Sequence, residues 1–277
     1  MVSSLASAFL APYLLRPLIL LVVLGVVGGV VGAMVNLRSM EFSAEAVVHS
    51  VFPGVVGGSL YAGLDGIVPG AAIAAVGVVL ALTLARGHRR GAGLDQASES
   101  KAEAGTAVVL TGAYAFGMVW SLRKGDMSGQ LEALMFGRLL EVTDERLAQA
   151  LIACAAGFIL AAATWKWQVA VGFDRSQFRS TFLIDLAANA AIAAVVVAGS
   201  AAIGVLLVIG YLVVPGAAAR LLAERQSTMV AAAVGVGLVG GLAGFGLMLV
   251  DSPNPISPQA AVALALVAMY GLALVKP

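Results

Sequence analysis

Long apolar runs without a charged residue are the feature that most constrains this chain. Runs of about 17 or more residues without Asp, Glu, Lys or Arg recur along the sequence, for example over 18–35 and 229–250. A helix needs about 20 mostly apolar residues to cross a bilayer. Only 11% of the residues are charged, too few to cover the surface of a water-soluble domain. The chain is therefore predicted to be an all-α, polytopic membrane protein in contact with the lipid bilayer.

The apolar runs predict about nine membrane-spanning helices within one domain over residues 1–277. Interruptions at Pro53-Gly54 and Gly199-Ser200 indicate that some helices are short or broken. Glycines four residues apart, as in Gly25/Gly29, are typical of helices that approach closely in lipid. The predicted spans are 18–35, 46–60, 67–84, 106–122, 147–164, 186–198, 201–214, 229–250 and 260–274.

Basic residues set the predicted orientation of these helices. Arg and Lys gather in 86–101, 166–179 and 220–225, and positively charged loops stay on the cytoplasmic side. Alternation then places the first residue outside and the last inside. Residues 1–15 are predicted to form an external or interfacial segment, and 86–104 and 217–226 to be cytoplasmic segments.

Several classes of function are excluded by what the sequence lacks. A net charge of +1 gives no field that would attract nucleic acid. The single cysteine, Cys154, provides no disulfide and no thiol cluster for a metal. No Gly-Lys dipeptide, serine elbow, His-Glu-x-x-His or Cys-x-x-Cys motif occurs, so we expect neither ATP hydrolysis nor other catalysis by this chain. No permanently bound cofactor is expected.

Glu45 and His49 are the candidate metal ligands. They stand at i and i+4, so both side chains leave one face of a helix. A carboxylate and a neutral imidazole can share a divalent first-row cation. In the alternative interpretation, Ser43 caps the helix and His49 is a buried histidine with satisfied hydrogen bonds. These residues alone leave both interpretations open.

A second segment of interest follows the apolar run 204–214. The run is predicted to stop at Pro215-Gly216, with a short amphipathic helix after it on the cytoplasmic side. Arg220 and Glu224 would pair at i and i+4, and Leu221 would lie on the apolar side. Such a segment is either an ordinary loop or a docking element.

The same residues resemble the membrane permeases of manganese, zinc and iron ABC importers. The stretch from Glu45 through His49 to Pro53-Gly54 is similar to their Asp-x-x-x-His-x-x-x-Pro-Gly motif, with Glu45 in place of the usual Asp. The other similar segments are 134–140 (Leu-Phe-Gly loop), Phe173-Asp174, and 205–219 (Val-Gly-x-Leu-Leu-Val…Pro-Ala-Ala-x-Ala).

The resemblance implies a homodimeric permease in the bacterial inner membrane. A separate cytoplasmic ABC ATPase would hydrolyse ATP, and an extracellular metal-binding protein would deliver the ion. Glu45 and His49 of two protomers would together offer four ligands to a transported divalent metal, manganese or zinc, or alternatively iron. The segment that couples to the ATPase would include Ala217, Ala218, Arg220, Leu221 and Glu224.

Three other functions remain open from the sequence. A secondary metal carrier would also contain buried ionisable residues but would work without an ATPase. An ABC permease for siderophore or cobalamin would have a wide, apolar pathway. For a structural membrane scaffold, replacing Glu45 and His49 would change nothing.

Overall fold

The protein folds into a bundle of helices, most of them long enough to cross a membrane. The computed structural model describes residues 12–87, 96–123, 137–200, 203–249 and 257–275, and within these ranges it contains helices and no strand. The all-α prediction is confirmed. The helices are α2 (Pro12–Leu37), α3 (Glu41–Ser50), α4 (Phe52–Ala62), α5 (Ile67–Gly87), α6 (Gln96–Leu122), α8 (Asp144–Phe173), α9 (Phe182–Ser200), α10 (Gly204–Leu222), α11 (Gln226–Met248) and α12 (Pro258–Val275), with short 3₁₀ turns η1 (Gly63–Gly66), η3 (Leu139–Glu141) and η4 (Arg175–Gln177).

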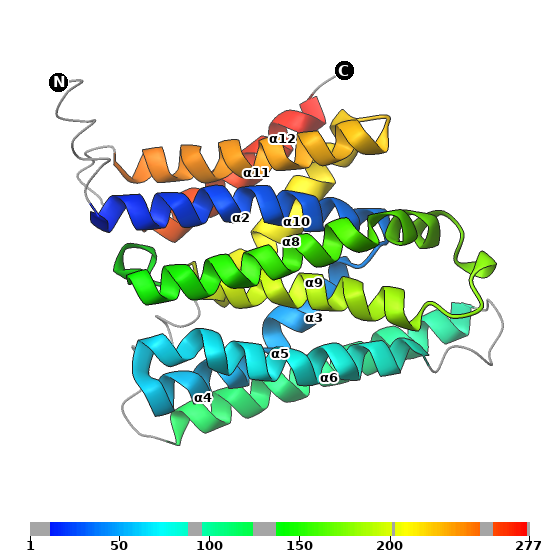
Figure 1. Ribbon diagram of the computed structural model, residues 1–277, viewed down its shortest axis with the longest axis horizontal. Helices are drawn as coiled ribbons and strands as arrows, with labels where there is room; N and C mark the ends of the chain where they lie inside the picture. The colour runs from blue at the N-terminus through cyan, green and yellow to red at the C-terminus, as the bar shows by residue number, and fades with distance from the viewer. Residues whose placement is uncertain (1–11, 88–95, 124–136, 201–202, 250–256, 276–277) are drawn as a thin grey trace.

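The bundle has two outer groups of helices with α8 and α9 between them (Figure 1). Helices α2, α10, α11 and α12 pack together on one side, and α4, α5 and α6 on the other. The short helix α3 lies between the two groups and contacts α5, α6, α9 and α10. Residues on α3 can therefore respond to movements on either side of the bundle.

The described helices account for the predicted number of membrane crossings. Seven segments are long and apolar enough to span a bilayer, and Leu207–Leu222 is a shorter apolar helix. One of the seven, Glu41–Leu84, is 44 residues long and turns back at η1, so α3 with α4 makes one crossing and α5 the next. The total agrees with the prediction of about nine helices.

The break predicted near Pro53-Gly54 is confirmed. Helix α3 ends at Ser50 and α4 begins at Phe52, with Pro53 at the start of α4, a position that proline favours. Helix α9 ends at Ser200, and α10 begins at Gly204 with a φ of 77°, a backbone angle that favours glycine.

Glycine contacts hold α2 tightly against α11, as the four-residue spacing predicts. A Cβ added at Gly29 would lie 2.7 Å from the Cα of Val234, and one added at Gly237 would lie 2.6 Å from the carbonyl oxygen of Gly25. Backbones this close leave no room for a side chain. Helices in lipid associate through such van der Waals packing.

Polar contacts between helix ends agree with the predicted orientation of the helices, in which successive loops lie on alternate sides of the membrane. At the predicted external end, Arg16 pairs with Asp144 at 2.6 Å and Arg146 with Asp65 at 3.2 Å. At the predicted cytoplasmic end, Arg38 in the turn after α2 bonds to α8 and α9, and Asn36 in the last turn of α2 bonds to α10. Residues that are predicted to lie on the same side of the membrane are therefore in contact.

The expectation that the apolar run stops at Pro215-Gly216 is wrong. Helix α10 continues through Pro215 to Leu222, and no separate helix follows before α11 begins at Gln226. A proline inside a membrane helix is tolerated where neighbouring helices pack around the freed backbone groups. Here Gly216 lies directly against the backbone of Gly32 in α2.

Parts of five predicted segments lie outside the described residues. These are 1–11 of the external or interfacial segment, 88–95 of the first cytoplasmic segment, 134–136 of the Leu-Phe-Gly loop, 201–202 of the span 201–214 and residue 250 of the span 229–250. Pro12 begins α2 and Gln96 begins α6. Gly137, with a φ of 79°, accepts a hydrogen bond from Gln259 Nε2 at 2.9 Å.

Candidate functional site

Helix α3 carries the candidate metal ligands on one face. Its other face is buried and consists of small or branched residues: Ser43, Ala44, Ala46, Val47, Val48 and Ser50. Glu41, Glu45 and His49 recur every four residues and so form a column on the remaining face. The residue before the first turn is Met40, and Ser43 lies inside the helix. The alternative in which Ser43 caps the helix is wrong.

Glu45 is exposed beside a cavity between α3 and α10. The cavity has a volume of about 420 Å³ and is lined by Glu41, Phe42, Glu45, Ile209, Gly210, Val213 and Val214. Within the described part of the chain, the Glu45 carboxylate accepts no hydrogen bond and forms no ion pair. An unpaired carboxylate within a membrane span is costly and usually marks a functional site.

His49 is half-buried and packs against α6. Its ring meets that of Tyr114 edge-on, with centroids 5.3 Å apart and an interplanar angle of 84°. Tyr114 also contacts Phe52, the first residue of α4. Among the described residues, no hydrogen bond joins the imidazole to another group. The aromatic contact orients the ring and leaves its nitrogen atoms available.

A single chain offers too few ligands to hold a metal ion at this place. Among the residues that the structure describes, no group of three or more His, Cys, Asp or Glu side chains is arranged to bind a metal. Transition metal sites in proteins commonly have four or more ligands. A second source of ligands is needed for a complete site.

The predicted coupling residues lie at the end of α10 and just after it. Ala217 is half-buried, Ala218 is buried, and Leu221 is 48% exposed. Glu224 lies in the bend that follows the helix. The expected pairing of Arg220 with Glu224 is wrong because Arg220 Nη1 instead donates to the carbonyl oxygen of Asn36 at 3.4 Å and to its Oδ1 at 3.3 Å.

Asn36 and Glu41 are functional candidates that the sequence interpretation missed. Asn36 Nδ2 donates to Glu41 Oε1 at 3.1 Å across the turn between α2 and α3. The available signal was that Glu41 stands one turn before Glu45 and therefore shares its face. It was overlooked because the predicted span began at residue 46.

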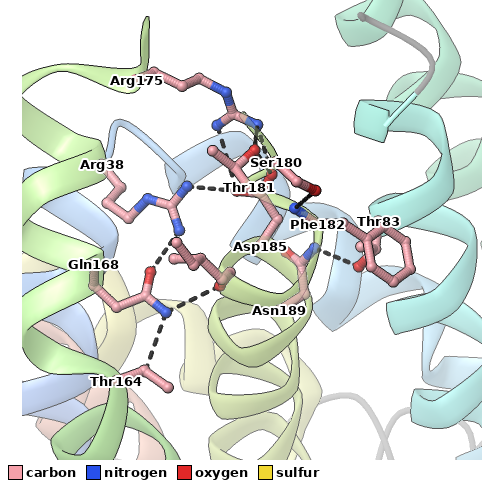
Figure 2. Close-up of polar contacts among 11 residues, drawn as sticks. Arg38, Thr83, Thr164, Gln168, Arg175, Ser180, Thr181, Phe182, Asp185 and Asn189 are labelled. Carbon is pink, nitrogen blue, oxygen red and sulfur yellow. Dashed lines mark hydrogen bonds and ion pairs between the residues drawn. The ribbon is translucent and has the colours of Figure 1, made fainter. Parts of the chain in front are cut away.

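A buried ionic cluster fixes the same turn to α8 and α9 (Figure 2). Arg38 donates to Asp185 Oδ1 and to Gln168 Oε1, both at 2.5 Å, and Arg175 donates to Asp185 Oδ2 at 2.5 Å. Arg38 and Asp185 side chains are only 2% and 3% exposed. Burial lowers the pKa of the Arg38 guanidinium, opposed by the adjacent Asp185 carboxylate, and an arginine stays charged nevertheless.

Phe173-Asp174 forms the end of α8. Asp174 accepts hydrogen bonds from the Ser176 hydroxyl at 2.6 Å, from the Gln177 side chain at 2.9 Å and from the Ser176 backbone N–H at 2.9 Å. These bonds favour the ionised carboxylate and lower the pKa of Asp174. The charged cap thus ends α8 and starts the turn η4.

Comparison with known proteins identifies the family. The profile of the ABC 3 transport family matches residues 11–276. The chain belongs to the ABC 3 transport family. This ABC 3 chain, with its apolar helices, is a multi-pass protein of the bacterial inner membrane.

Individual relatives agree with this assignment. The chain is 28% identical over 207 residues to the chelated iron transport system membrane protein YfeC of Yersinia pestis, a match that covers 73% of this chain and 66% of the relative's length. The fold is similar to PsaBC from Streptococcus pneumoniae, solved in complex with a Fab, with a TM-score of 0.78, 20% identity and coverage of 100% of this chain and 97% of the other.

Proposed function

We propose that this ABC 3 chain is the permease subunit of an ATP-driven importer for a divalent transition metal, manganese, zinc or iron. Two copies would form the pathway, with Glu45 and His49 of each copy as the ligands that the ion meets. A cytoplasmic ATPase would bind at the end of α10, around Ala217, Ala218, Arg220, Leu221 and Glu224. An extracellular metal-binding protein would supply the ion.

The observation that carries this proposal is the unpaired Glu45 carboxylate one helical turn from His49. Ionisable side chains within membrane spans are normally paired, and among the described residues neither Glu45 nor His49 has a hydrogen-bond or ion-pair partner. Two ligands per chain fall short of a site, whereas two chains would provide four. A site with few ligands also lets the metal ion dissociate, and a transported ion must leave its site as readily as it binds.

The name of one relative supports iron as the metal that is transported. YfeC is named for chelated iron transport. Membership of an ABC transport family favours an ATP-driven permease over a secondary carrier or a scaffold.

Metal uptake by the reconstituted complex tests the proposal. Proteoliposomes containing the permease, its ATPase and its binding protein would be assayed with Mn²⁺, Zn²⁺ and Fe²⁺ in turn. We expect Glu45→Ala and His49→Ala to reduce uptake at least about tenfold while expression and assembly stay normal, and Glu45→Asp to retain most activity because it keeps the carboxylate. Gln149→Ala, at the predicted external end outside α3, serves as the control.

Uptake at the wild-type rate by both alanine variants would contradict the pathway assignment. Uptake without ATP would favour a secondary carrier.

A metal chelate is the second candidate cargo, favoured by the name of YfeC. The cavity of about 420 Å³ beside Glu45 is smaller than most sites that enclose a large organic ligand. Uptake assays with free Fe²⁺ and with a siderophore-bound iron distinguish the two. Transport of the chelate alone, unaffected by Glu45→Ala, would replace the free-ion proposal.

A further inference from the structure

Asn36 connects the end of α10 to the start of α3. Its side-chain amide has a donor, Nδ2, and an acceptor, Oδ1, and both form hydrogen bonds. Nδ2 donates to Glu41 Oε1 at 3.1 Å, and Oδ1 accepts from Arg220 Nη1 at 3.3 Å. The backbone carbonyl of Asn36 accepts from the same nitrogen of Arg220 at 3.4 Å. Three helix ends, those of α2, α3 and α10, therefore meet at one amide.

Both hydrogen bonds of this amide involve a charged partner. Such bonds are roughly twice as strong as bonds between neutral groups. The amide of Asn36 itself is buried, at 7% exposed, whereas Glu41 is half-buried and Arg220 is exposed. Because the buried amide bonds to both residues, a displacement of Arg220 that moves Asn36 also moves the hydrogen-bond donor of Glu41.

Glu41 lies in the first turn of α3, one turn before Glu45 and two before His49. It also lines the cavity beside Glu45. Any rotation or shift of this first turn moves the whole ligand column, because α3 is only ten residues long.

We infer that Asn36 is a positioning residue that couples the ATPase-docking end of α10 to the metal ligands on α3. This inference rests on the proposed function and deepens it. When the ATPase closes and moves Arg220, Asn36 passes the movement to Glu41, and Glu45 and His49 change their position relative to the partner chain. Coupling free energies between sites usually correspond to a factor of about 5 to 150.

A general structural role for Asn36 makes a different prediction from coupling. A residue that only stabilises the fold affects assembly and leaves the number of ions moved per ATP unchanged. A coupling residue lowers that ratio while the complex still assembles. The ratio of metal uptake to ATP hydrolysis is therefore the deciding measurement.

The substitution Asn36→Asp removes one bond selectively. A carboxylate at position 36 still accepts from Arg220 but cannot donate to Glu41, and it repels that carboxylate. Adding Glu41→Gln restores a donor at position 41, so the double variant regains a bond of reversed direction. Rescue by the second substitution would show that the bond itself is needed.

A matched control comes from another buried asparagine. Asn189 of α9 donates from Nδ2 to Thr83 Oγ1 of α5 at 3.1 Å, which also joins two helices but lies outside the connection to α10. Asn36→Leu and Asn189→Leu each remove one buried asparagine. Only the first should change coupling.

The experiment uses the full complex of permease, ATPase and binding protein in proteoliposomes, with Mn²⁺, Zn²⁺ and Fe²⁺ each as the probe. We expect Asn36→Asp and Asn36→Leu to lower the ions taken up per ATP by about tenfold, the Asn36→Asp/Glu41→Gln pair to recover most of the loss, and Asn189→Leu to keep the wild-type ratio.

Two results would overturn the inference. A wild-type ratio in Asn36→Asp and Asn36→Leu, with normal metal uptake by the unmodified complex, overturns the inference alone. Absence of uptake of all three ions by the unmodified complex overturns the proposed function and the inference with it.

Discussion

Replacing Asp185 by alanine should destabilise the protein more than any other change in the buried ionic cluster. Asp185 is the only carboxylate among the contacts of this cluster that the structure describes, and it neutralises both Arg38 and Arg175. Its removal leaves the Arg38 guanidinium, with 2% of its side chain exposed, without a counter-charge. An uncompensated buried charge costs about 3–5 kcal/mol.

The structure places the Asp185→Ala cost near the lower end of that range. Arg38 keeps one acceptor, Gln168 Oε1 at 2.5 Å, so the expected loss is about 3 kcal/mol. Arg175→Ala is the matched control because it removes the other partner, whose side chain is 42% exposed. Exposed ion pairs contribute about 1 kcal/mol or less, and Asp185 would still bond to Arg38 and Thr181.

Thermal unfolding in detergent micelles, followed by tryptophan fluorescence, measures the difference. At about 2–4 °C per kcal/mol for a chain of this size, Asp185→Ala should lower Tm by about 6–12 °C and Arg175→Ala by less than about 4 °C. Equal losses in the two variants would refute the reasoning, as would a loss below about 1 kcal/mol for Asp185→Ala.

Two further predictions follow from packing and from protonation. Gly29→Ala should cost about 1–3 kcal/mol, because the added Cβ would lie 2.7 Å from the Val234 Cα. Gly246→Ala meets no atom within 4 Å and lies within α11, so it should be neutral or stabilise by up to about 1 kcal/mol; equal Tm values for the two variants would contradict this packing. The hydrogen bonds of Asp174 lower its folded-state pKa below the ordinary 3.8, so their stabilisation is present above about pH 4 and is lost as the pH falls through the folded-state value. The Tm values of the unmodified protein and Asp174→Ala should therefore converge between pH 7 and pH 3, and a constant difference would argue against the cap.

The length of the apolar runs predicted the helices well, because a backbone in lipid has few other ways to satisfy its hydrogen bonds. A chain segment in hydrocarbon must satisfy its own N–H and C=O groups, so an uncharged run of sufficient length becomes a helix. The break before Pro53 was also predictable, since proline favours the first turn of a helix. Pro215 was misread because the same residue inside a helix depends on what packs around it, here Gly32 against Gly216.

The ionic cluster could not be predicted from local pattern. Arg38 and Asp185 are 147 positions apart, and Arg38 and Gln168 are 130 apart, so their meeting depends on how α2, α8 and α9 pack. Asp185 lies one residue before the predicted span 186–198. A carboxylate at the edge of a span, with Arg175 in the preceding basic loop, was the signal that could have indicated an ion pair.

The break between α3 and α4 has a consequence for one backbone carbonyl group inside the membrane. Val51 has a helical backbone conformation, and helical hydrogen bonds continue across it, from Val51 N–H to the Val47 carbonyl oxygen at 3.0 Å and from Val55 N–H to the Val51 carbonyl oxygen at 3.2 Å. Position 53 is the exception, because proline has no N–H and cannot donate to the carbonyl oxygen four residues before it, that of His49. The backbone of His49 therefore lacks the donor that any other residue at position 53 would supply, directly beside the proposed metal ligand.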